Sequence, residues 1–488
     1  MAFDLLLRNG RVVDPLNKIN AVTDISIADG KIVKVSGHQD PGKALEVIDA
    51  AGMLVTPGIV DSHVHVAPEG AGGISFNMLL RNGVTTALDM SGPIDVFVDE
   101  ARVNGHGVNA GCLHALAPGV DIRNRGANGA EIGDAIDKAL EKGAFGVKIL
   151  GGHVPFTPET TGRIIEEAAK RNVYVAFHAG TTANGSNIEG FGEAVDLANG
   201  RPLHMAHVNS YCRGQMEDPL METKRLLDVL IKNPNIVSES YLSVMNGTSA
   251  AIDPETGKAR SAVTRACLEA RGYSSDKTGI AKAVKDGWCR ICGRVGSEIT
   301  RLAPQEGYAY WKRVNTEAWC SFPVNNPAAM LACATARRPD GTFTVNAIST
   351  DGGFIPRNVI MENGLRLAQM GYMDLDDVIA KATLYPARML GLADKGHLSP
   401  GADGDVAVFR PLGGKAEYTI IGGKVRMAAG ICREGPGVIF TSARGGKALK
   451  RKKAAHIVMD IAGSGYMKGN AKPCRREAQR VGWDSPIS

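Results

Sequence analysis

The 488-residue sequence lacks the features of several classes of protein. No run approaches about 20 uninterrupted apolar residues, which excludes a membrane-spanning helix. The N-terminal stretch MAFDLLLRNGRVVD places Asp4 and Arg8 within a short apolar run, unlike the longer run of a signal peptide. The sequence has no GxxxxGKS/T phosphate loop and no GxGxxG motif after a strand. We therefore expect a cytoplasmic protein with no membrane partner and no nucleotide-binding fold.

The cysteines do not form the dense pattern of a disulfide framework. There are nine, an odd number spread through a long chain, which favours reduced thiols. Cys289 and Cys292 form the only CxxC motif, and a four-cysteine zinc site needs a second pair. Cys267, Cys320 and Cys333 lie in the same region, but without that second pair the sequence does not favour a structural zinc.

Positive charge is concentrated at the C-terminal end. Residues 441–488 contain 11 Lys and Arg against three Asp and Glu, although the net charge of the chain is only +5. We predict a basic C-terminal extension over residues 437–488 and interpret its stretch ARGGKALKRKK as solvated and partly disordered. The KRKK run alone does not indicate a nucleic-acid partner, and we expect none.

The composition is that of a globular enzyme, with 44% hydrophobic and 22% charged residues. The first fifty residues alternate apolar and polar positions and are broken by NG and DG dipeptides, which is the signature of β-hairpins. The segments KGHLSPGADGDVAVFRP and AEYTIIGGKVRMAAG return to the same pattern near the other end of the chain. We predict a small β-sandwich domain built from residues 1–56 and 395–436.

From residue 57 the pattern changes to short apolar strands that alternate with helical stretches, as in a parallel barrel. Eight strands are predicted, at residues 59–66, 84–90, 108–116, 145–150, 173–178, 203–208, 236–241 and 345–350. The fold class is therefore α/β, a (β/α)8 TIM barrel over residues 57–394. The connection at about 243–343 is far longer than usual, and we expect it to be a lid or a substrate-binding insertion.

Metal-binding side chains occur at the ends of these strands. The C-terminal ends of barrel strands share one face, so we expect these residues to meet there. His63 and His65 point the same way on one strand and can bind one ion together. Imidazole and carboxylate suit Zn²⁺ and similar divalent ions. The full set is His63, His65, Lys148, His178, His207 and Asp351.

Lys148 stands in an otherwise apolar strand. Burying an ammonium group without a partner costs several kcal/mol, so its presence requires a counter-ion or a reaction that removes the charge. A single strand-end histidine is usually a packing residue, but four histidines, one aspartate and this lysine at strand ends together predict a metal centre.

At this point the sequence resembles the amidohydrolase superfamily, in the branch of dihydroorotases, hydantoinases, isoaspartyl dipeptidases and N-acyl-D-amino-acid deacylases. The resemblance is carried by PGIVDSHVH at 57–65, the strand-four VKIL, the FHAG and MAHV histidines, and the aspartate of ISTDGG. The segments ATLYPARMLGL and KGHLSPGADGDVAVF also resemble the superfamily's closing segment. Together these cover about residues 3–430.

The resemblance implies a binuclear centre, with two Zn²⁺ ions per subunit. Lys148 would be carboxylated by CO₂ and bridge the two metals as a carbamate. His63, His65 and Asp351 would hold one ion, and His178 and His207 the other. A hydroxide bridging both ions would attack the substrate, and Asp351 would act as the general base and pass the proton to the leaving nitrogen. The predicted activity is metal-dependent hydrolysis of a C–N amide bond, in a cyclic amide or an N-acyl amino acid.

Two departures from the family pattern bear on the substrate. Some hydantoinase-like relatives have a Tyr five residues after the bridging Lys that binds the developing oxyanion, and this chain has His153 there. A histidine N–H can donate a comparable hydrogen bond, so His153 is a candidate catalytic residue, or else a loop histidine without a role. His178 and His207 lie 29 residues apart, a short spacing that favours a linear amide.

Candidate substrate-binding residues are Arg357 and Arg213, each six residues after a predicted metal ligand, where a guanidinium group could bind a carboxylate. Asn209, Glu239 and Tyr241 also lie near strand ends, but the sequence assigns them no role. We expect a small-molecule substrate and, by family analogy, a homo-oligomer.

Other activities stay open on the same barrel. A metal-dependent deaminase of a heterocycle is one, although the acidic residue nearest after His178 is Glu189, eleven positions away. Ester or lactone hydrolysis is another, because the attacking hydroxide does not distinguish carbonyl types. A non-catalytic scaffold would be expected to lose ligands, and every proposed ligand is present.

Overall fold

The barrel is built as the sequence predicts. A computed structural model describes residues 3–66, 73–90 and 92–469. Within them, all eight predicted strands are found, and consecutive strands pair in parallel. A two-residue strand, β18 (Gly352–Gly353), follows the last of them and pairs with the first, so the sheet is nearly closed. The eight strands are β6 (Ile59–His65), β7 (Val84–Asp89), β8 (Asn109–Leu116), β9 (Gly146–Ile149), β10 (Tyr174–Phe177), β11 (Leu203–Met205), β12 (Ile236–Tyr241) and β17 (Ala347–Ser349).

Amphipathic helices cover the outside of the barrel. α4 begins after Thr157, whose hydroxyl accepts a hydrogen bond from the backbone N–H of Thr160, and Pro158 occupies its first turn. Its apolar face, which includes Ile164 and Ile165, is buried against the sheet. The outer helices are α1 (Ile74–Leu80), α2 (Ile94–Asn104), α3 (Gly129–Glu141), α4 (Pro158–Lys170), α5 (Ile188–Ala198), α6 (Pro219–Lys232), α11 (Ile360–Gln369), α12 (Leu375–Ala382) and α13 (Leu384–Leu390).

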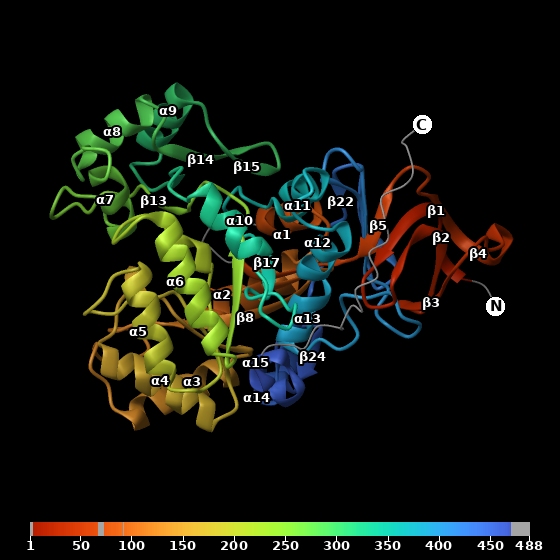
Figure 1. Cartoon of the computed structure of the whole chain (residues 1–488), viewed down its shortest axis with the longest axis horizontal. Coiled ribbons are helices and arrows are strands. Elements are labelled where there is room, and N and C mark those ends of the chain that lie inside the picture. The colour runs from red at the N-terminus through yellow and green to blue at the C-terminus, as the bar shows by residue number, and fades with distance from the viewer. Residues whose placement is uncertain (1–2, 67–72, 91, 470–488) are drawn as a thin grey trace.

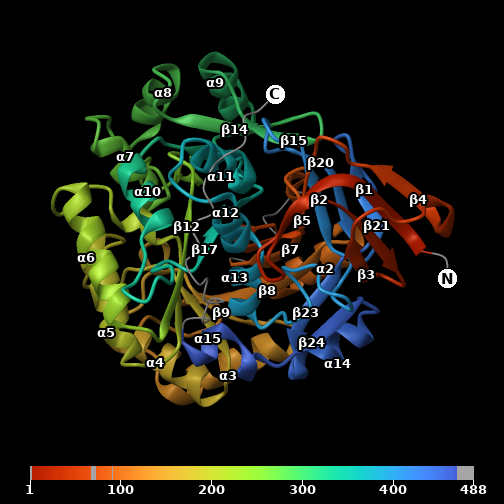
Figure 2. The same ribbon diagram turned by 45° about the vertical axis from the view of Figure 1, so that its right-hand side comes forward.

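The prediction of a small β domain made from both ends of the chain is confirmed. Its nine strands form one hydrogen-bonded sheet, in which β5 pairs antiparallel with β19 and so joins the two ends. Figures 1 and 2 show the red N-terminal strands beside the blue C-terminal ones, at one side of the barrel. The strands are β1 (Phe3–Asp14), β2 (Ile19–Ala28), β3 (Lys31–Ser36), β4 (Ala44–Asp49), β5 (Leu54–Pro57), β19 (Val406–Phe409), β20 (Ala416–Ile421), β21 (Lys424–Ala428) and β22 (Ile431–Cys432).

The insertion after β12 folds into a unit with its own core. It lies at the top of Figure 1, and its four strands form a separate sheet in the order β13-β16-β14-β15. The core includes the buried residues Cys267, Cys289, Trp311 and Cys320. Among the described residues the cysteines are free thiols, and none belongs to a cluster able to hold a metal ion. The elements are β13 (Thr248–Ser249), α7 (Ala262–Glu269), α8 (Lys277–Lys285), β14 (Arg290–Val295), β15 (Glu298–Arg301), α9 (Pro304–Arg313) and β16 (Trp319–Ser321). The next helix, α10 (Pro327–Thr335), packs on the barrel against α6 and β12.

The basic segment 443–453 is mostly helical and not partly disordered as the sequence suggested, although its Lys and Arg side chains are largely exposed to solvent. β23 (Val438–Ser442) pairs with the start of β8, and most of the basic stretch forms α14 (Ala443–Arg451), which packs on the barrel beside α3. The prediction failed because the buried residues of α14 are mostly glycine and alanine, which carry little hydrophobic signal. β24 (His456–Met459) and α15 (Gly465–Lys468) follow. Residues 470–488 of the predicted extension lie outside the described residues.

The C-terminal segment contributes to the interior of the barrel. Phe440 of β23 and Tyr466 of α15 are buried in a core cluster with residues of the barrel strands. The Tyr466 ring stacks on Tyr174 of β10 with ring centroids 4.0 Å apart. The Tyr466 hydroxyl donates to the Pro202 carbonyl oxygen and accepts from the Val175 N–H. In the part of the chain that the structure describes, no helix combines the length and apolar character needed to cross a membrane.

Leu449→Ala tests the packing of α14. Leu449 is fully buried over Gly143, where an added Cβ would lie 3.0 Å from the leucine Cδ2. Removing this side chain should lower the free energy of unfolding by about 2–5 kcal/mol, measured from the urea-unfolding midpoint. The matched control is Lys450→Ala on the exposed side of the helix, which should change stability by less than about 0.5 kcal/mol. Equal, small effects of both substitutions would contradict this packing.

Candidate metal centre

One cluster of potential metal ligands joins the first and last barrel strands. His63 and His65 come from β6, and Asp351 follows β17. The Asp351 Oδ1 atom lies 2.8 Å from Nε2 of His65 and 3.3 Å from Nε2 of His63. One donor atom from each of the three residues lies within 4.8 Å of the others, so the three can bind a single ion. The structure therefore brings together the three residues that the sequence assigned to one metal.

A buried carboxylate beneath this cluster fixes the orientation of His63. The Oε1 atom of Glu239, on β12, lies 2.7 Å from Nδ1 of His63 and accepts the backbone N–H of His207 at 2.7 Å. Its Oε2 atom accepts the Ser349 hydroxyl. Burial alone would raise the pKa of Glu239, but the neighbouring histidines, His63 above all, lower it. With Nδ1 donating to this carboxylate, Nε2 of His63 is free for a metal.

The second histidine pair lies next to the first cluster. The ring centroids of His178 and His207 are 4.5 Å apart, and the His207 ring stacks on His63 at 5.2 Å. Nε2 of His178 is hydrogen-bonded to the Ser186 hydroxyl and Nδ1 of His207 to the Ser210 hydroxyl, each at 2.8 Å. Burial lowers the pKa of both imidazoles well below the ordinary value, so both are neutral, as metal binding requires.

Lys148 of β9 is buried in the same barrel interior. Its side chain is 2% exposed, and its Nζ lies 3.4 Å from the Met90 sulfur. Among the described residues, no carboxylate lies within ion-pairing distance of that nitrogen. Burial lowers the pKa of Lys148 to about 8, although the charges of Glu239 and Asp351 oppose the shift. The lowered pKa means that burial in this strand disfavours the charged ammonium form of Lys148, as the sequence predicted.

Asp351 is held in an uncommon backbone conformation. Its φ is +48°, in the left-handed region, and its N–H donates to the His63 carbonyl oxygen at 2.9 Å. His207 has a similarly unusual φ of +34°. Strained backbone at two proposed ligands is typical of residues whose positions serve a functional site.

Arg357 lies in the cavity wall but already has a carboxylate partner. Its Nη2 atom forms an ion pair with Oδ2 of Asp351, and its Nε donates to the Asp351 carbonyl oxygen at 2.5 Å. The guanidinium carbon also lies 4.9 Å from the centroid of the Tyr241 ring. The structure thus places Arg357 as a group that orients Asp351. The Asp351 carboxylate occupies the guanidinium nitrogens that we expected to bind a substrate carboxylate.

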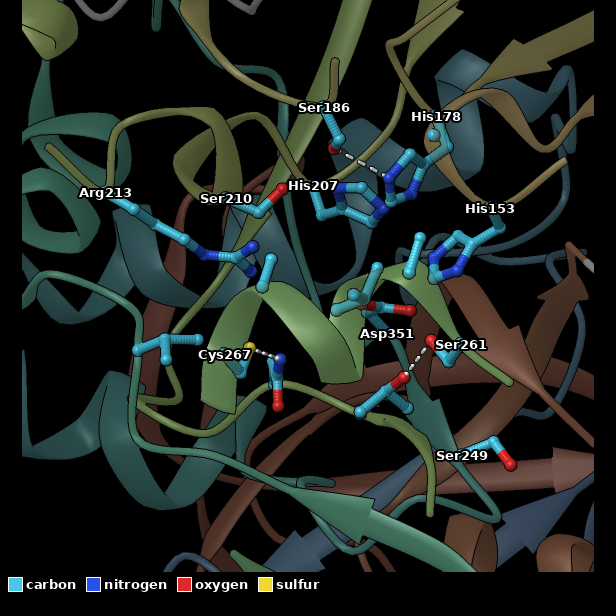
Figure 3. Close-up of a pocket in the computed structure, with 18 of the residues that line it drawn as sticks. His153, His178, Ser186, His207, Ser210, Arg213, Ser249, Ser261, Cys267 and Asp351 are labelled. Atoms are coloured by element: carbon cyan, nitrogen blue, oxygen red, sulfur yellow. Dashed lines mark hydrogen bonds between the residues drawn. The ribbon is translucent and has the colours of Figure 1, made fainter. Parts of the chain in front are cut away.

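A cavity of about 1220 Å³ opens over the metal ligands. Figure 3 shows the imidazoles of His153, His178 and His207 along one side of it, with Arg213 extending toward its centre. Residues of the insertion, among them Ser261 and Cys267 of the α7 region, form the opposite wall. All six predicted ligands and the three other predicted site residues line this single cavity.

His153 is adjacent to the second histidine pair. Its ring centroid lies 4.6 Å from that of His178. His153 is exposed to the cavity, and desolvation by the surrounding protein lowers its pKa, so the imidazole is neutral at pH 7 and keeps one N–H donor. This position is compatible with the predicted contact to a substrate oxygen.

Sequence reasoning left three buried polar residues without a role. His204 pairs through Nδ1 with the Tyr174 hydroxyl at 2.9 Å, and its Nε2 lies 3.8 Å from Oε1 of Glu239. Asp61 accepts the Thr350 hydroxyl at 2.6 Å, which ties β6 to the segment that carries Asp351. Glu239, in the strand IVSESY, offered the same signal as Lys148, an ionisable residue inside a buried strand.

These observations define the class of the protein as a metal-binding (β/α)8 barrel hydrolase. The model of the amidohydrolase family matches residues 54–218 and 333–429, more than half of the chain, and the chain belongs to this family. The residues between the two matched stretches include the insertion. The protein is a hydrolase that acts on C–N bonds other than ordinary peptide bonds, as the sequence predicted.

The curated relatives include several dihydroorotases. The enzyme of Geobacter metallireducens is 22% identical over 445 residues, covering 86% of this chain and 91% of the relative. That of Streptococcus pneumoniae is 23% identical over 425 residues, covering 83% and 90%. An allantoinase of Escherichia coli is 35% identical over 109 residues, which is 21% of this chain and 23% of that protein.

Solved structures confirm the fold. A crystal structure of D-aminoacylase superposes with a TM-score of 0.63 at 18% identity, covering 89% of this chain and 99% of the other. A D-hydantoinase gives a TM-score of 0.58 at 15% identity, covering 90% and 99%. At these identities the likeness establishes the barrel with its small β domain and leaves the substrate open.

Glu239→Gln tests whether this carboxylate prepares the metal site. Loss of its charge removes the fixed orientation of His63, so the affinity for Zn²⁺ should fall about 10–100-fold, measured by competition with a chelator. Glu222→Gln is the matched control, because Glu222 is also fully buried but accepts backbone N–H groups of Gly214 and Met216 away from the ligands. It should leave Zn²⁺ affinity unchanged. Unchanged affinity in both variants would contradict the assignment.

Proposed function

We propose that this protein hydrolyses an amide C–N bond at a centre of two divalent metal ions bridged by carboxylated Lys148. The observation that carries the proposal is the arrangement of a buried, unpaired Lys148 beside two groups of metal ligands, one of His63, His65 and Asp351 and the other of His178 and His207. Each group has too few charged donors to neutralise a divalent ion, and a carbamate on Lys148 supplies the missing charge to both.

Carboxylation also accounts for the lysine itself. A neutral amine is the form that attacks CO₂, and burial favours that form by lowering the pKa of Lys148 to about 8. The neutral lysine nitrogen forms a bond with the carbon of CO₂ as a C=O π bond breaks, and one N–H proton leaves, so the neutral amine becomes a carbamate anion. Counted from the ammonium form, two protons are released in all. An anion between two cations is favourable in the same interior where an ammonium group is costly.

The residues around the centre divide the hydrolytic work. Two divalent ions, when bound, lower the pKa of a water molecule and polarise the scissile carbonyl group. Asp351 takes the proton as water attacks and delivers it to the leaving nitrogen, while Arg357 holds the other carboxylate oxygen. The neutral imidazole of His153 donates a hydrogen bond to the developing oxyanion. A solved D-aminoacylase structure has a binuclear metal centre in which one metal activates and the second attenuates, which supports the presence of two metal positions.

The arrangement disfavours the deaminase alternative. Glu189, the acidic residue that follows His178, forms a two-point ion pair with Arg225 at 2.6 and 2.9 Å and does not line the cavity. Ring protonation in a deaminase needs an acid within reach of the substrate. Ester or lactone hydrolysis would use the same attacking group, so an amide panel that includes matched esters separates the two activities.

Asp351→Asn is the direct test of the proposed reaction. Asparagine cannot accept the proton, so kcat should fall by about 10²- to 10⁴-fold on any amide that the Zn²⁺-loaded enzyme hydrolyses. The panel contains hydantoin, dihydrouracil, dihydroorotate, N-acetyl amino acids and the esters matched to these amides, each assayed with and without a chelator. Metal content is measured on the same samples, which separates loss of proton transfer from loss of metal.

Asp121→Asn is the matched control. Asp121 also pairs with a histidine, His114, at 2.9 Å, but neither residue lines the cavity. This variant should retain the parent kcat. Full activity of Asp351→Asn with normal metal content would refute the role of Asp351, and hydrolysis that survives chelation would refute the metal-dependent reaction.

A further inference from the structure

Arg213 presents an unoccupied guanidinium fork to the cavity. Its Nε donates to the Oδ1 atom of Asn325 at 2.9 Å. The two terminal nitrogens have no hydrogen bond or ion pair with any described residue, and the side chain lines the cavity beside the histidines. A guanidinium group held through Nε directs its remaining donors in one plane, which suits a two-point contact with a carboxylate.

The residue that holds Arg213 is itself fixed in a buried network. Asn325 lies in the insertion, is 4% exposed, and donates through Nδ2 to the Tyr241 hydroxyl at 2.9 Å and to the Ser243 carbonyl oxygen at 3.1 Å. Tyr241 is 1% exposed, and its ring centroid lies 6.3 Å from that of His207. The Arg213 fork is therefore positioned relative to the metal ligands by buried side chains.

The proposed carboxylation removes the positive charge of Lys148, and the other cationic groups of the cavity wall have partners. Arg357 pairs with Asp351, and Arg260 pairs with Glu317 at 2.9 Å. Arg271 lies over the Trp288 ring at 4.3 Å. Glu269, at the end of α7, is the one acidic lining residue besides Asp351 among the described residues. The region beside the histidines thus carries an uncompensated positive charge at Arg213.

We propose that Arg213, oriented by Asn325 of the insertion, selects amide substrates that carry a carboxylate. This inference rests on the proposed function and adds the class of substrate to it, an anionic amide whose carboxylate binds the fork while its carbonyl group lies over the metal ligands. It also assigns the insertion a role, because Asn325 is a positioning residue that acts through Arg213. The cavity, at about 1220 Å³, has room for the remainder of such a molecule.

The test uses two pairs of compounds that differ in the carboxylate. One pair is N-acetyl-leucine, in both enantiomers, with its carboxamide, and the other is dihydroorotate with dihydrouracil. The first measurement is the ratio of kcat/KM between the acid and the neutral member with Zn²⁺-loaded enzyme. The second is the Kd of each compound for the metal-free protein by calorimetry, which does not depend on turnover.

Arg213→Gln is the main variant. The parent should prefer the acid by about 10- to 100-fold, the range expected for a hydrogen-bonded charged group. In Arg213→Gln the ratio of kcat/KM for the acid over the neutral member should fall to near one. The fall should come from a lower kcat/KM for the acid, while kcat/KM for the neutral member changes less than about threefold. Asn325→Ala should raise KM for the acid with little change in kcat, because the fork keeps its charge but loses its orientation.

Arg260→Gln is the matched control. It removes one positive charge from the same cavity without touching the fork, and it should keep the parent preference. If it lowers the preference as much as Arg213→Gln does, the preference for acids arises from the total positive charge of the cavity and not from the Arg213 fork. Equal rates and equal Kd values for the acids and the neutral compounds in the parent would overturn the inference.

Failure of the proposed function gives a different pattern. If no compound is hydrolysed, the proposed amide hydrolysis fails for these compounds. The Kd values then test the Arg213 inference by themselves. Weaker binding of the acids to Arg213→Gln than to the parent then supports the fork, and equal or undetectable binding to both overturns it.

Discussion

A lysine ammonium group inside a barrel must either find a counter-ion or lose its charge, and the organisation of this site depends on that constraint. Lys148 is surrounded by neutral imidazoles and by a thioether sulfur, and the nearest carboxylates are engaged elsewhere: Glu239 with His63, and Asp351 with Arg357. The interior thus disfavours the cation and favours an anion that two metal ions can share. The proposed conversion of Lys148 to a carbamate would satisfy both requirements with one reaction.

The carboxylate of Glu239 organises the residues around that lysine. It contacts His63 and the backbone of His207, one residue from each proposed metal group, and Ser349 of the strand that precedes Asp351. Below it, Nδ1 of His204 is hydrogen-bonded to the Tyr174 hydroxyl, and the Tyr174 ring stacks on Tyr466 of the C-terminal segment. The proposed metal ligands His63 and His207 are thus oriented by one buried carboxylate in the barrel interior.

The parts of the molecule that the sequence predicted are those with a short-range signal. All eight barrel strands were identified because apolar runs alternate with helical periodicity, and the proposed ligands were singled out because each lies within or just after the end of a strand. Leu449 and Tyr466 were missed because isolated apolar residues in a basic, glycine-rich stretch do not indicate which surface they cover. The partners of Arg357 and Arg213 could not be predicted, since both arginines follow a proposed metal ligand by six residues. Only the folded chain shows that Arg357 pairs with Asp351 and that Arg213 is held by Asn325 of the insertion. Glu239 was noted without a role because its three partners come from three different strands.

The measurement that tests this account most directly is the metal stoichiometry of the parent protein and of Lys148→Ala. Both are titrated with Zn²⁺ in the presence of bicarbonate and analysed by elemental mass spectrometry after removal of free ion. The account predicts two equivalents per chain in the parent and a sharp fall in the variant, because each metal group loses the bridging anion. One equivalent in both proteins would contradict the bridge and leave His63, His65 and Asp351 as a mononuclear site.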